Sequence, residues 1–161
     1  MKLERVCNLE IDRVIRENGV KSYFGIFSID NIPFSLLSGK QTFIVVCNLE
    51  KKGNFGSHFI VLVYHLGHLL YLDSLAPVKE EIKSIFFKFN PLRLHTLKSP
   101  LQSINSQACG YYCLFFVLYF DRVLCNKPVD FIFPFSQNKQ DGNDAICLKN
   151  ITMIDRLNKT H

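Results

Sequence analysis

The feature that most constrains this chain is an uninterrupted uncharged segment, ACGYYCLFFVLYF, at residues 108–120. Its 13 residues fall well short of the roughly 20 apolar residues that a membrane-spanning helix needs. The segment is apolar all round, which indicates a helix enclosed by other elements. We therefore expect a central buried helix that starts near Ala108 and ends near Leu124.

The composition is that of a compact domain with a real core. The chain has 161 residues, of which 48% are hydrophobic and 20% charged, whereas a disordered chain would be polar and poor in aromatic residues. We expect a single domain over residues 1–161. The net charge of +5 leaves room for an anionic partner, although no basic run exceeds two residues.

The amino-terminal residues carry frequent charges and have no secretion signal, so a reducing compartment is expected. An even number of cysteines would suggest disulfides only in a secreted chain. Four of the six cysteines should behave as small buried hydrophobic residues: Cys7, Cys47, Cys125 and Cys147.

Hydrophobic periodicity and turn residues predict the remaining elements. Helices are expected at 3–18 and from Pro77 to Phe89, and strands at 41–48, 58–64, 68–75 and 93–97. A polar loop is expected at 98–107, and residues 126–161 are expected to be mostly loop with a short helix near 150–158.

The strands at 58–64 and 68–75 have the pattern of an antiparallel hairpin. Residues whose numbers have a constant sum face each other in such a hairpin. With the turn centred between residues 65 and 66, His58 and Asp73 are expected to lie opposite or nearly opposite each other. The hairpin would thus place an imidazole beside a carboxylate.

A cysteine nucleophile needs a base, a group that orients the base, and donors for the oxyanion. Cys109 opens the central helix, where the helix dipole lowers a thiol pKa, whereas Cys113 lies one turn deeper and is expected to pack in the core. Their spacing alone leaves a shared metal or disulfide open. Gly110 is expected to let substrate approach the backbone. The Cys109 amide and the Gln102 side chain are candidate oxyanion donors.

These residues carry a resemblance to a known family. The segments LQSINSQACGYYCLFF, GSHFIVLVY, LYLDSLAP and SYFGIFSID together resemble the adenovirus endopeptidase (adenain) family of cysteine proteases. The similarity runs from about Leu9 to Phe120 in the same order. Its most specific part is a pattern formed by Gln102, Asn105, Ser106, Cys109 and Gly110.

The resemblance implies that Cys109 is the nucleophile, His58 the general base, Asp73 the orienting acid and Gln102 an oxyanion donor, with no metal. The SUMO-deconjugating proteases of the same clan use this order of residues. The implied fold class is α+β, with a central mixed β-sheet packed against the buried helix that presents the cysteine.

The resemblance also implies a biological setting. Family members cleave viral precursor polypeptides during virion maturation, in the host nucleus or at the site of virus assembly and in the virion. They are activated by DNA and by a short viral peptide that is disulfide-bonded. Because the position that aligns with that disulfide is near Leu94, in a segment without a thiol, peptide activation here would be non-covalent. We expect a monomer that needs no cofactor for the chemistry itself and no membrane.

The sequence leaves three alternatives open. A deconjugating protease or an acyltransferase of the same clan would use the same residues, but deconjugating enzymes typically carry an acidic residue where Ala108 precedes the cysteine. A non-catalytic, capsid-associated binding module is a second alternative. The third is a metal-binding domain that uses His65, His68, Cys109 and Cys113.

Overall fold

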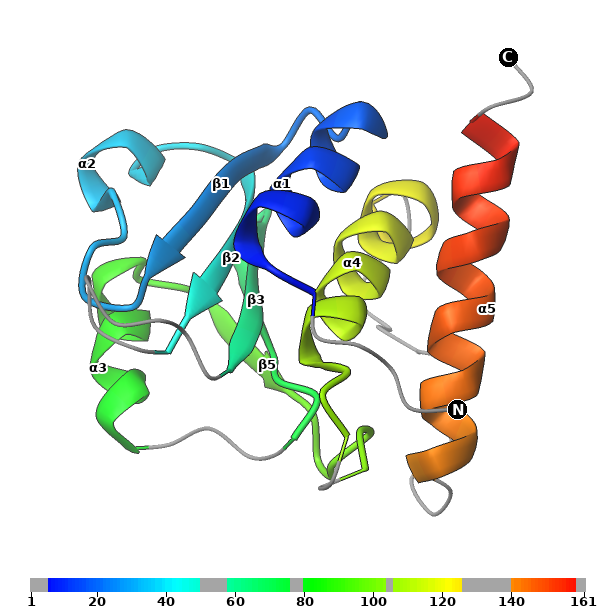
Figure 1. Ribbon diagram of the computed structural model, residues 1–161. Helices are drawn as coiled ribbons and strands as arrows, with labels where there is room; N and C mark the ends of the chain where they lie inside the picture. Colours follow the sequence, from blue (N-terminus) through cyan, green and yellow to red (C-terminus); the bar gives the residue numbers. More distant parts are fainter. Residues whose placement is uncertain (1–5, 50–57, 76–79, 104–105, 126–139, 159–161) are drawn as a thin grey trace.

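The computed structural model describes residues 6–49, 58–75, 80–103, 106–125 and 140–158. A central sheet lies between helices on both faces (Figure 1). The strands are β1 (Tyr23–Ser28), β2 (Thr42–Asn48), β3 (Phe59–His65), β4 (His68–Leu72) and β5 (Arg93–Thr96). The helices are α1 (Asn8–Glu17), α2 (Phe34–Leu37), α3 (Glu80–Lys88), α4 (Cys109–Tyr119) and α5 (Gln140–Asn158), and a π-helical turn, η1 (Phe120–Leu124), continues α4.

The five strands lie side by side in sequence order, β1 to β5. The outer pairs, β1 with β2 and β4 with β5, are parallel, whereas the inner pairs around β3 are antiparallel. This arrangement confirms the α+β class and the central mixed sheet that were expected. β1 and α2 were not among the predicted elements.

Alternate side chains point to opposite faces of each strand. Because helices cover both faces of the sheet, the side chains on both sides of the inner strands are buried. Val61 and Val63 of β3 pack toward α1 and α4, whereas Ile60 and Leu62 face the side covered by α2 and α3. Figure 1 shows the resulting layers, with α5 lying outside α4. The sheet thus separates the environment of α4 from that of α2 and α3.

Helix α4 is the buried central helix that its sequence predicted. Nine of its eleven residues are buried, and Phe115 and Phe116 are completely enclosed. Loss of either ring would cost about 3–5 kcal/mol of stability. Within the described residues, no helix has the length and apolar character needed to cross a membrane.

The β3–β4 hairpin turns one residue later than the sequence suggested. His65 pairs with His68 and Val61 with Leu72, so the turn is centred between Leu66 and Gly67. Both turn residues have positive φ, 48° and 86°, which suits the tight turn of a two-residue hairpin. His58 and Asp73 are consequently diagonal and not directly opposite, still within reach of each other.

Helix α5 corrects the expectation that the region from residue 126 onward is mostly loop. It begins at Gln140 and not near residue 150. Asn143, Cys147 and Ile151 are buried, and their spacing of four residues forms one helical face. Contact with the core compensates for the poor helix propensity of Gly142 and the asparagines. Residues 126–139 lie outside the described residues.

Two further expectations need adjustment. Helix α1 spans Asn8–Glu17 and not 3–18, with Cys7 at its amino-terminal cap; residues 1–5 lie outside the described residues. Cys47 and Cys147 are buried as expected, but Cys7 is exposed and Cys125 is partly exposed. Cys7 is exposed because it precedes an amphipathic helix whose buried side chains, Ile11 and Ile15, begin four residues later. All six cysteines are free thiols.

Candidate active site

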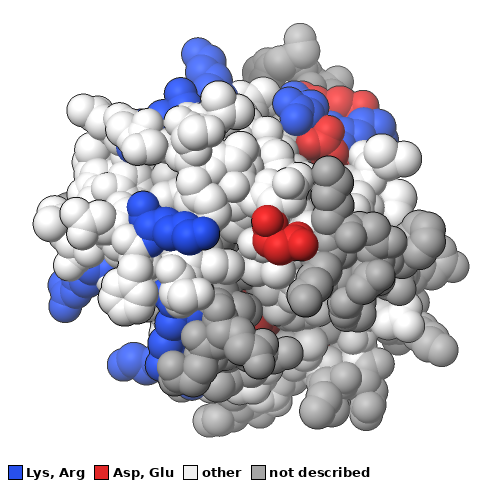
Figure 2. All heavy atoms as spheres, turned by 90° about the vertical axis from the view of Figure 1, so that its left-hand side faces the viewer, with Lys and Arg blue, Asp and Glu red and all other residues white. Residues whose placement is uncertain are grey.

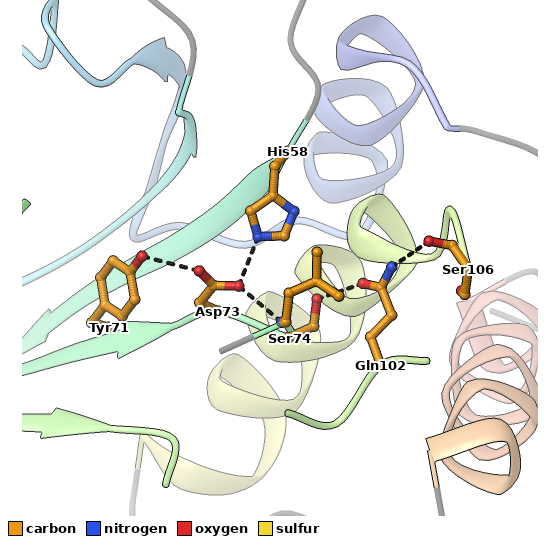
Figure 3. Close-up of polar contacts among 7 residues, drawn as sticks. His58, Tyr71, Asp73, Ser74, Gln102 and Ser106 are labelled. Carbon is orange, nitrogen blue, oxygen red and sulfur yellow. Dashed lines mark hydrogen bonds and ion pairs between the residues drawn. The ribbon is translucent and has the colours of Figure 1, made fainter. Parts of the chain in front are cut away.

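The hairpin brings His58 and Asp73 together at one end of the sheet. His58 lies directly before β3, and Asp73 directly follows β4. The Nε2 atom of His58 is 2.7 Å from Oδ1 of Asp73, and Figure 3 shows the other ring nitrogen directed away from the carboxylate. The ring is therefore held by one nitrogen with the second left for another partner.

The Asp73 carboxylate is held by two further donors. The Tyr71 hydroxyl donates to Oδ2 at 3.1 Å, and the Leu75 amide donates to Oδ1 at 2.9 Å. The carboxylate is only 6% exposed, so these hydrogen bonds satisfy a buried charge. They also fix the direction from which Asp73 meets the imidazole.

Cys109, the first residue of α4, is the second partner of His58. Burial opposes formation of the thiolate, but the hydrogen bond with His58, the amides of Phe59 and Gly110 and the charge of His58 together lower the thiol pKa. Burial also lowers the pKa of His58, but its contacts with Asp73 and Cys109 outweigh that effect and raise it to about 9. The protonated imidazole therefore makes Cys109 ionise more readily than an ordinary thiol.

Cys113 has the opposite environment. Its side chain is 1% exposed, and burial raises its pKa well above the usual thiol value. A thiol in such surroundings is inert. The structure thus distinguishes the two cysteines of α4 as their positions in the sequence suggested, with Cys109 in the reactive setting.

Gln102 is held near the start of α4 by hydrogen bonds at both ends of its amide. The Ser74 hydroxyl donates to its Oε1 at 2.7 Å, and its Nε2 donates to the Ser106 carbonyl, also at 2.7 Å (Figure 3). The Nε2 group has a second hydrogen, and among the described residues no acceptor takes it. The Cys109 amide, at the first position of α4, has no acceptor within the helix. These two groups are suitable donors for an oxyanion.

The strand end that carries Asp73 also supports Gln102. The Ser74 carbonyl accepts hydrogen bonds from the amides of Leu101 and Gln102, both at 2.9 Å. Neither Ser74 nor Tyr71 was predicted from the sequence. Both were detectable in principle, because they are polar residues next to Asp73 in an otherwise apolar segment. Asn105 of the sequence pattern lies outside the described residues.

Gly110 has a different role from the one expected. A Cβ atom at this position would lie 3.1 Å from Cβ of Val6 and 3.2 Å from Cδ1 of Ile11. The glycine therefore permits close packing of α4 against α1 and the residues before it. The side on which a Cβ would lie is occupied by the protein's own core and is not available to substrate.

The structure does not assemble the alternative metal site. His65 and His68 lie at the turn, at the opposite end of β3 from His58 and Cys109. His65 Nδ1 is 2.8 Å from the Thr42 hydroxyl, and His68 Nδ1 is 2.9 Å from Nε2 of His95. In the described ranges, no three His, Cys, Asp or Glu side chains are arranged to hold a metal ion.

Comparisons with known proteins do not identify a family for this chain. No protein-family model matches the chain, and no curated protein is significantly similar to it. The function of the chain is therefore inferred from the arrangement of Cys109, His58, Asp73 and Gln102.

Proposed function

We propose that this protein is a cysteine endopeptidase of the adenain type. The observation that carries the proposal is the continuous chain from the Cys109 thiol through His58 to the buried Asp73 carboxylate. The amide donors of Cys109 and Gln102 lie at the same end of the sheet. A nucleophile, a base, an orienting acid and oxyanion donors are the components that thiol-dependent acyl transfer requires.

The reaction begins when the Cys109 thiolate attacks the carbonyl carbon of the scissile peptide bond. The oxyanion that forms accepts hydrogen bonds from the Cys109 amide and the Gln102 side chain. The His58 imidazolium donates its proton to the departing amine, and the carbon–nitrogen bond breaks to leave a thioester on Cys109. Neutral His58 then takes a proton from the water that attacks the thioester; the carbon–sulfur bond breaks, the acid is released, and the Cys109 thiolate and the His58 imidazolium are regenerated.

The biological setting in this proposal comes from the sequence resemblance. We propose that the substrates are viral precursor polypeptides cut during virion maturation, in the nucleus or at the assembly site and in the virion. Double-stranded DNA and a non-covalently bound viral peptide are the proposed activators. A helix that presents a cysteine against a mixed sheet is the architecture expected for this family and supports the proposal.

The test is labelling with a thiol-reactive acyl-type peptide probe at neutral pH, followed by mapping of the modified residue by mass spectrometry. We expect Cys109 alone to react, because its pKa is lowered by His58. The His58→Ala variant should lose the labelling. Cys113→Ala is the matched control on the same helix and should retain it.

Parallel arms separate this proposal from its alternatives. Labelling with and without duplex DNA tests activation, since an activator should increase the rate at Cys109. A ubiquitin-like carboxyl-terminal probe that reacts faster than the peptide probe would instead indicate a deconjugating enzyme. Uniform slow labelling of Cys109 and exposed Cys7, unchanged in His58→Ala and by DNA, would contradict the catalytic assignment.

A further inference from the structure

A second candidate site lies on the opposite side of the sheet from Cys109. It is a cavity of about 420 Å³ bounded by α2 and the link to β2, the strands β2 and β3, the hairpin turn and the end of α3. This volume is within the range of small-molecule pockets. Its lining residues are Phe34, Leu37, Ser38, Gly39, Lys40, Gln41, Phe43, Tyr64, Leu66, Gly67, Lys88 and Phe89.

Four aromatic rings form a continuous wall of the cavity. The rings of Phe43 and Tyr64 are stacked, with centroids 5.3 Å apart and an angle of 8° between them. Phe89 lies 5.0 Å from Phe43 and 4.9 Å from Phe34, in tilted contacts. Phe43 is almost completely buried, whereas the other three rings are partly exposed. The wall therefore combines rings from α2, from the sheet and from the residue that follows α3, and its partly exposed surface comes from Phe34, Tyr64 and Phe89.

Two lysines supply the charge of this cavity, and no Asp or Glu is among its described lining residues. Lys88 Nζ lies 4.6 Å from the centroid of the Phe34 ring, which lines the cavity, whereas Lys40 Nζ lies 4.9 Å from that of Phe24, which is not among the described lining residues. Neither ammonium has a carboxylate within ion-pair distance in the described part of the chain. Figure 2 faces the side covered by α2 and α3, where Lys and Arg side chains project from a mostly uncharged surface that also carries acidic side chains.

We propose that this cavity binds a small aromatic anion, with its ring against the Phe43, Tyr64 and Phe89 wall and its acidic group paired with Lys88, while Lys40 adds a second positive charge to the lining. Apolar walls favour burial of a planar ring, and two ammonium groups without acidic partners favour a carboxylate or a similar anion. The site is independent of the proposed peptidase chemistry, because the sheet separates it from Cys109.

The experiment is an NMR titration of the full chain with 2-naphthoate, compared with the neutral isostere 2-naphthalenemethanol. We expect saturable binding of naphthoate that shifts the amides of Gly39, Leu66 and Phe89. The neutral compound should bind about tenfold more weakly because it lacks the charged contact. Lys40→Gln/Lys88→Gln should show a similar loss, and Lys149→Gln on α5 is the matched control that should bind normally.

Two further arms complete the design. Cys109→Ala should bind naphthoate like the unmodified chain, which keeps this proposal separate from the catalytic one. Equal binding of both naphthalene compounds, unchanged binding in the double lysine variant, or shifts confined to another surface would each overturn it. A blocked peptide with adjacent Asp and Phe that binds more tightly than naphthoate would overturn the assignment to a small molecule and identify a protein segment as the occupant.

Discussion

At the scale of single residues, the candidate site depends on a buried carboxylate that determines the charge of its neighbours. Asp73 accepts hydrogen bonds from His58, Tyr71 and Leu75. Its contact with His58 counters the effect of burial and keeps the imidazole protonated to about pH 9. The charged imidazole in turn lowers the pKa of Cys109. Asp73 thus lowers the pKa of the Cys109 thiol indirectly, because it keeps the imidazole between them protonated.

The first prediction concerns the pH dependence of peptide hydrolysis. Activity should rise as Cys109 ionises below the usual thiol range, and it should fall as His58 loses its proton near pH 9. In Asp73→Asn the pKa of His58 should fall because only its contact with Cys109 still opposes the effect of burial, while the pKa of Cys109 should rise. The pH range of activity should narrow at both its acidic and its alkaline limit, and the rate of peptide hydrolysis at neutral pH should fall by about 100-fold or more.

The measurement is the pH profile of kcat/KM for peptide hydrolysis, taken for the unmodified chain and for Asp73→Asn. The apparent pKa values belong to the coupled pair and not to either residue alone. An alkaline limb near pH 9 that persists in Asp73→Asn would contradict the role given to this carboxylate.

The second prediction separates oxyanion stabilisation from thiol activation. Gln102→Ala should lower kcat for peptide hydrolysis by about 100- to 1000-fold, because one donor to the oxyanion is lost. Alkylation of Cys109 by iodoacetamide forms no oxyanion, so its rate should stay within about twofold of the original. Equal loss in both assays would show that Gln102 acts on the structure of the site instead.

The Ser74 hydroxyl provides a weaker version of the same test. Ser74→Ala leaves the Gln102 amide without the donor to its Oε1 and allows the amide to rotate. Hydrolysis should fall by about tenfold, with alkylation again unchanged. A loss of hydrolysis as large as that of Gln102→Ala would mean that Ser74 fixes more than the amide.

At the scale of elements, the end of the β3–β4 hairpin organises most of the site. Asp73 orients His58, and the next residue, Ser74, binds Gln102 through both its hydroxyl and its carbonyl. Helix α4 contributes the Cys109 thiol and the Cys109 amide at its first position. Its approach to the sheet is set by packing against α1, where Gly110 allows the closest contact.

Gly110→Ala should lower the free energy of unfolding by about 1–3 kcal/mol, because the added methyl group would press on Val6 and Ile11. The measurement is urea unfolding. Gly142→Ala is a matched control at an exposed position of α5, and it should be neutral or stabilising by up to about 1 kcal/mol. Similar effects of both substitutions would show that the Gly110 contact is not tight.

The sequence predicted those parts of the site that depend on local pattern. The hairpin placed His58 near Asp73 because strand pairing is regular, and the apolar run predicted α4. The sequence did not predict the supporting hydroxyl of Ser74, since a hydrogen bond to Gln102, 28 residues away, leaves no periodic signal. The Tyr71 hydroxyl, two residues from Asp73, was not predicted either, because the apolar pattern of the strand does not show what a tyrosine hydroxyl contacts. Only the second half of α5 was predicted, because the helicity of its first half depends on contact with the core more than on propensity. The sequence predicted that substrate approaches Gly110, because the residues that pack against it, Val6 and Ile11, are about 100 positions away in the sequence and could not be inferred from local pattern.

At the scale of the whole molecule, α5 supports the site from outside. Asn143, which is completely buried, donates to the Leu101 carbonyl at 3.1 Å. The Tyr112 hydroxyl lies 3.1 Å from the same carbonyl and 2.8 Å from Oδ1 of Asp144. The segment that carries Gln102 is therefore held between the hairpin, α4 and α5.

Asn143→Ala should lower the free energy of unfolding by about 1–3 kcal/mol, because a buried carbonyl loses a donor. It should also reduce peptide hydrolysis, since Leu101 adjoins Gln102. Lys149→Ala, exposed on the same helix, is the control and should change neither quantity. Urea unfolding and kcat/KM measure the two effects, and normal hydrolysis in a destabilised Asn143→Ala protein would show that α5 does not influence the site.

The components of the site come from contacts of very different range. His58 and Asp73 are 15 residues apart and meet within one hairpin, a unit that pairs early when local contacts form first. Cys109 reaches them only when α4 docks on the completed sheet. Before α4 meets the hairpin, Cys109 lacks the contacts that lower its pKa, so we expect it to react as an ordinary thiol in a partly folded chain and to gain its reactivity when α4 docks. Brief alkylation at intervals during refolding would then report the docking of α4 as a change in the reactivity of Cys109.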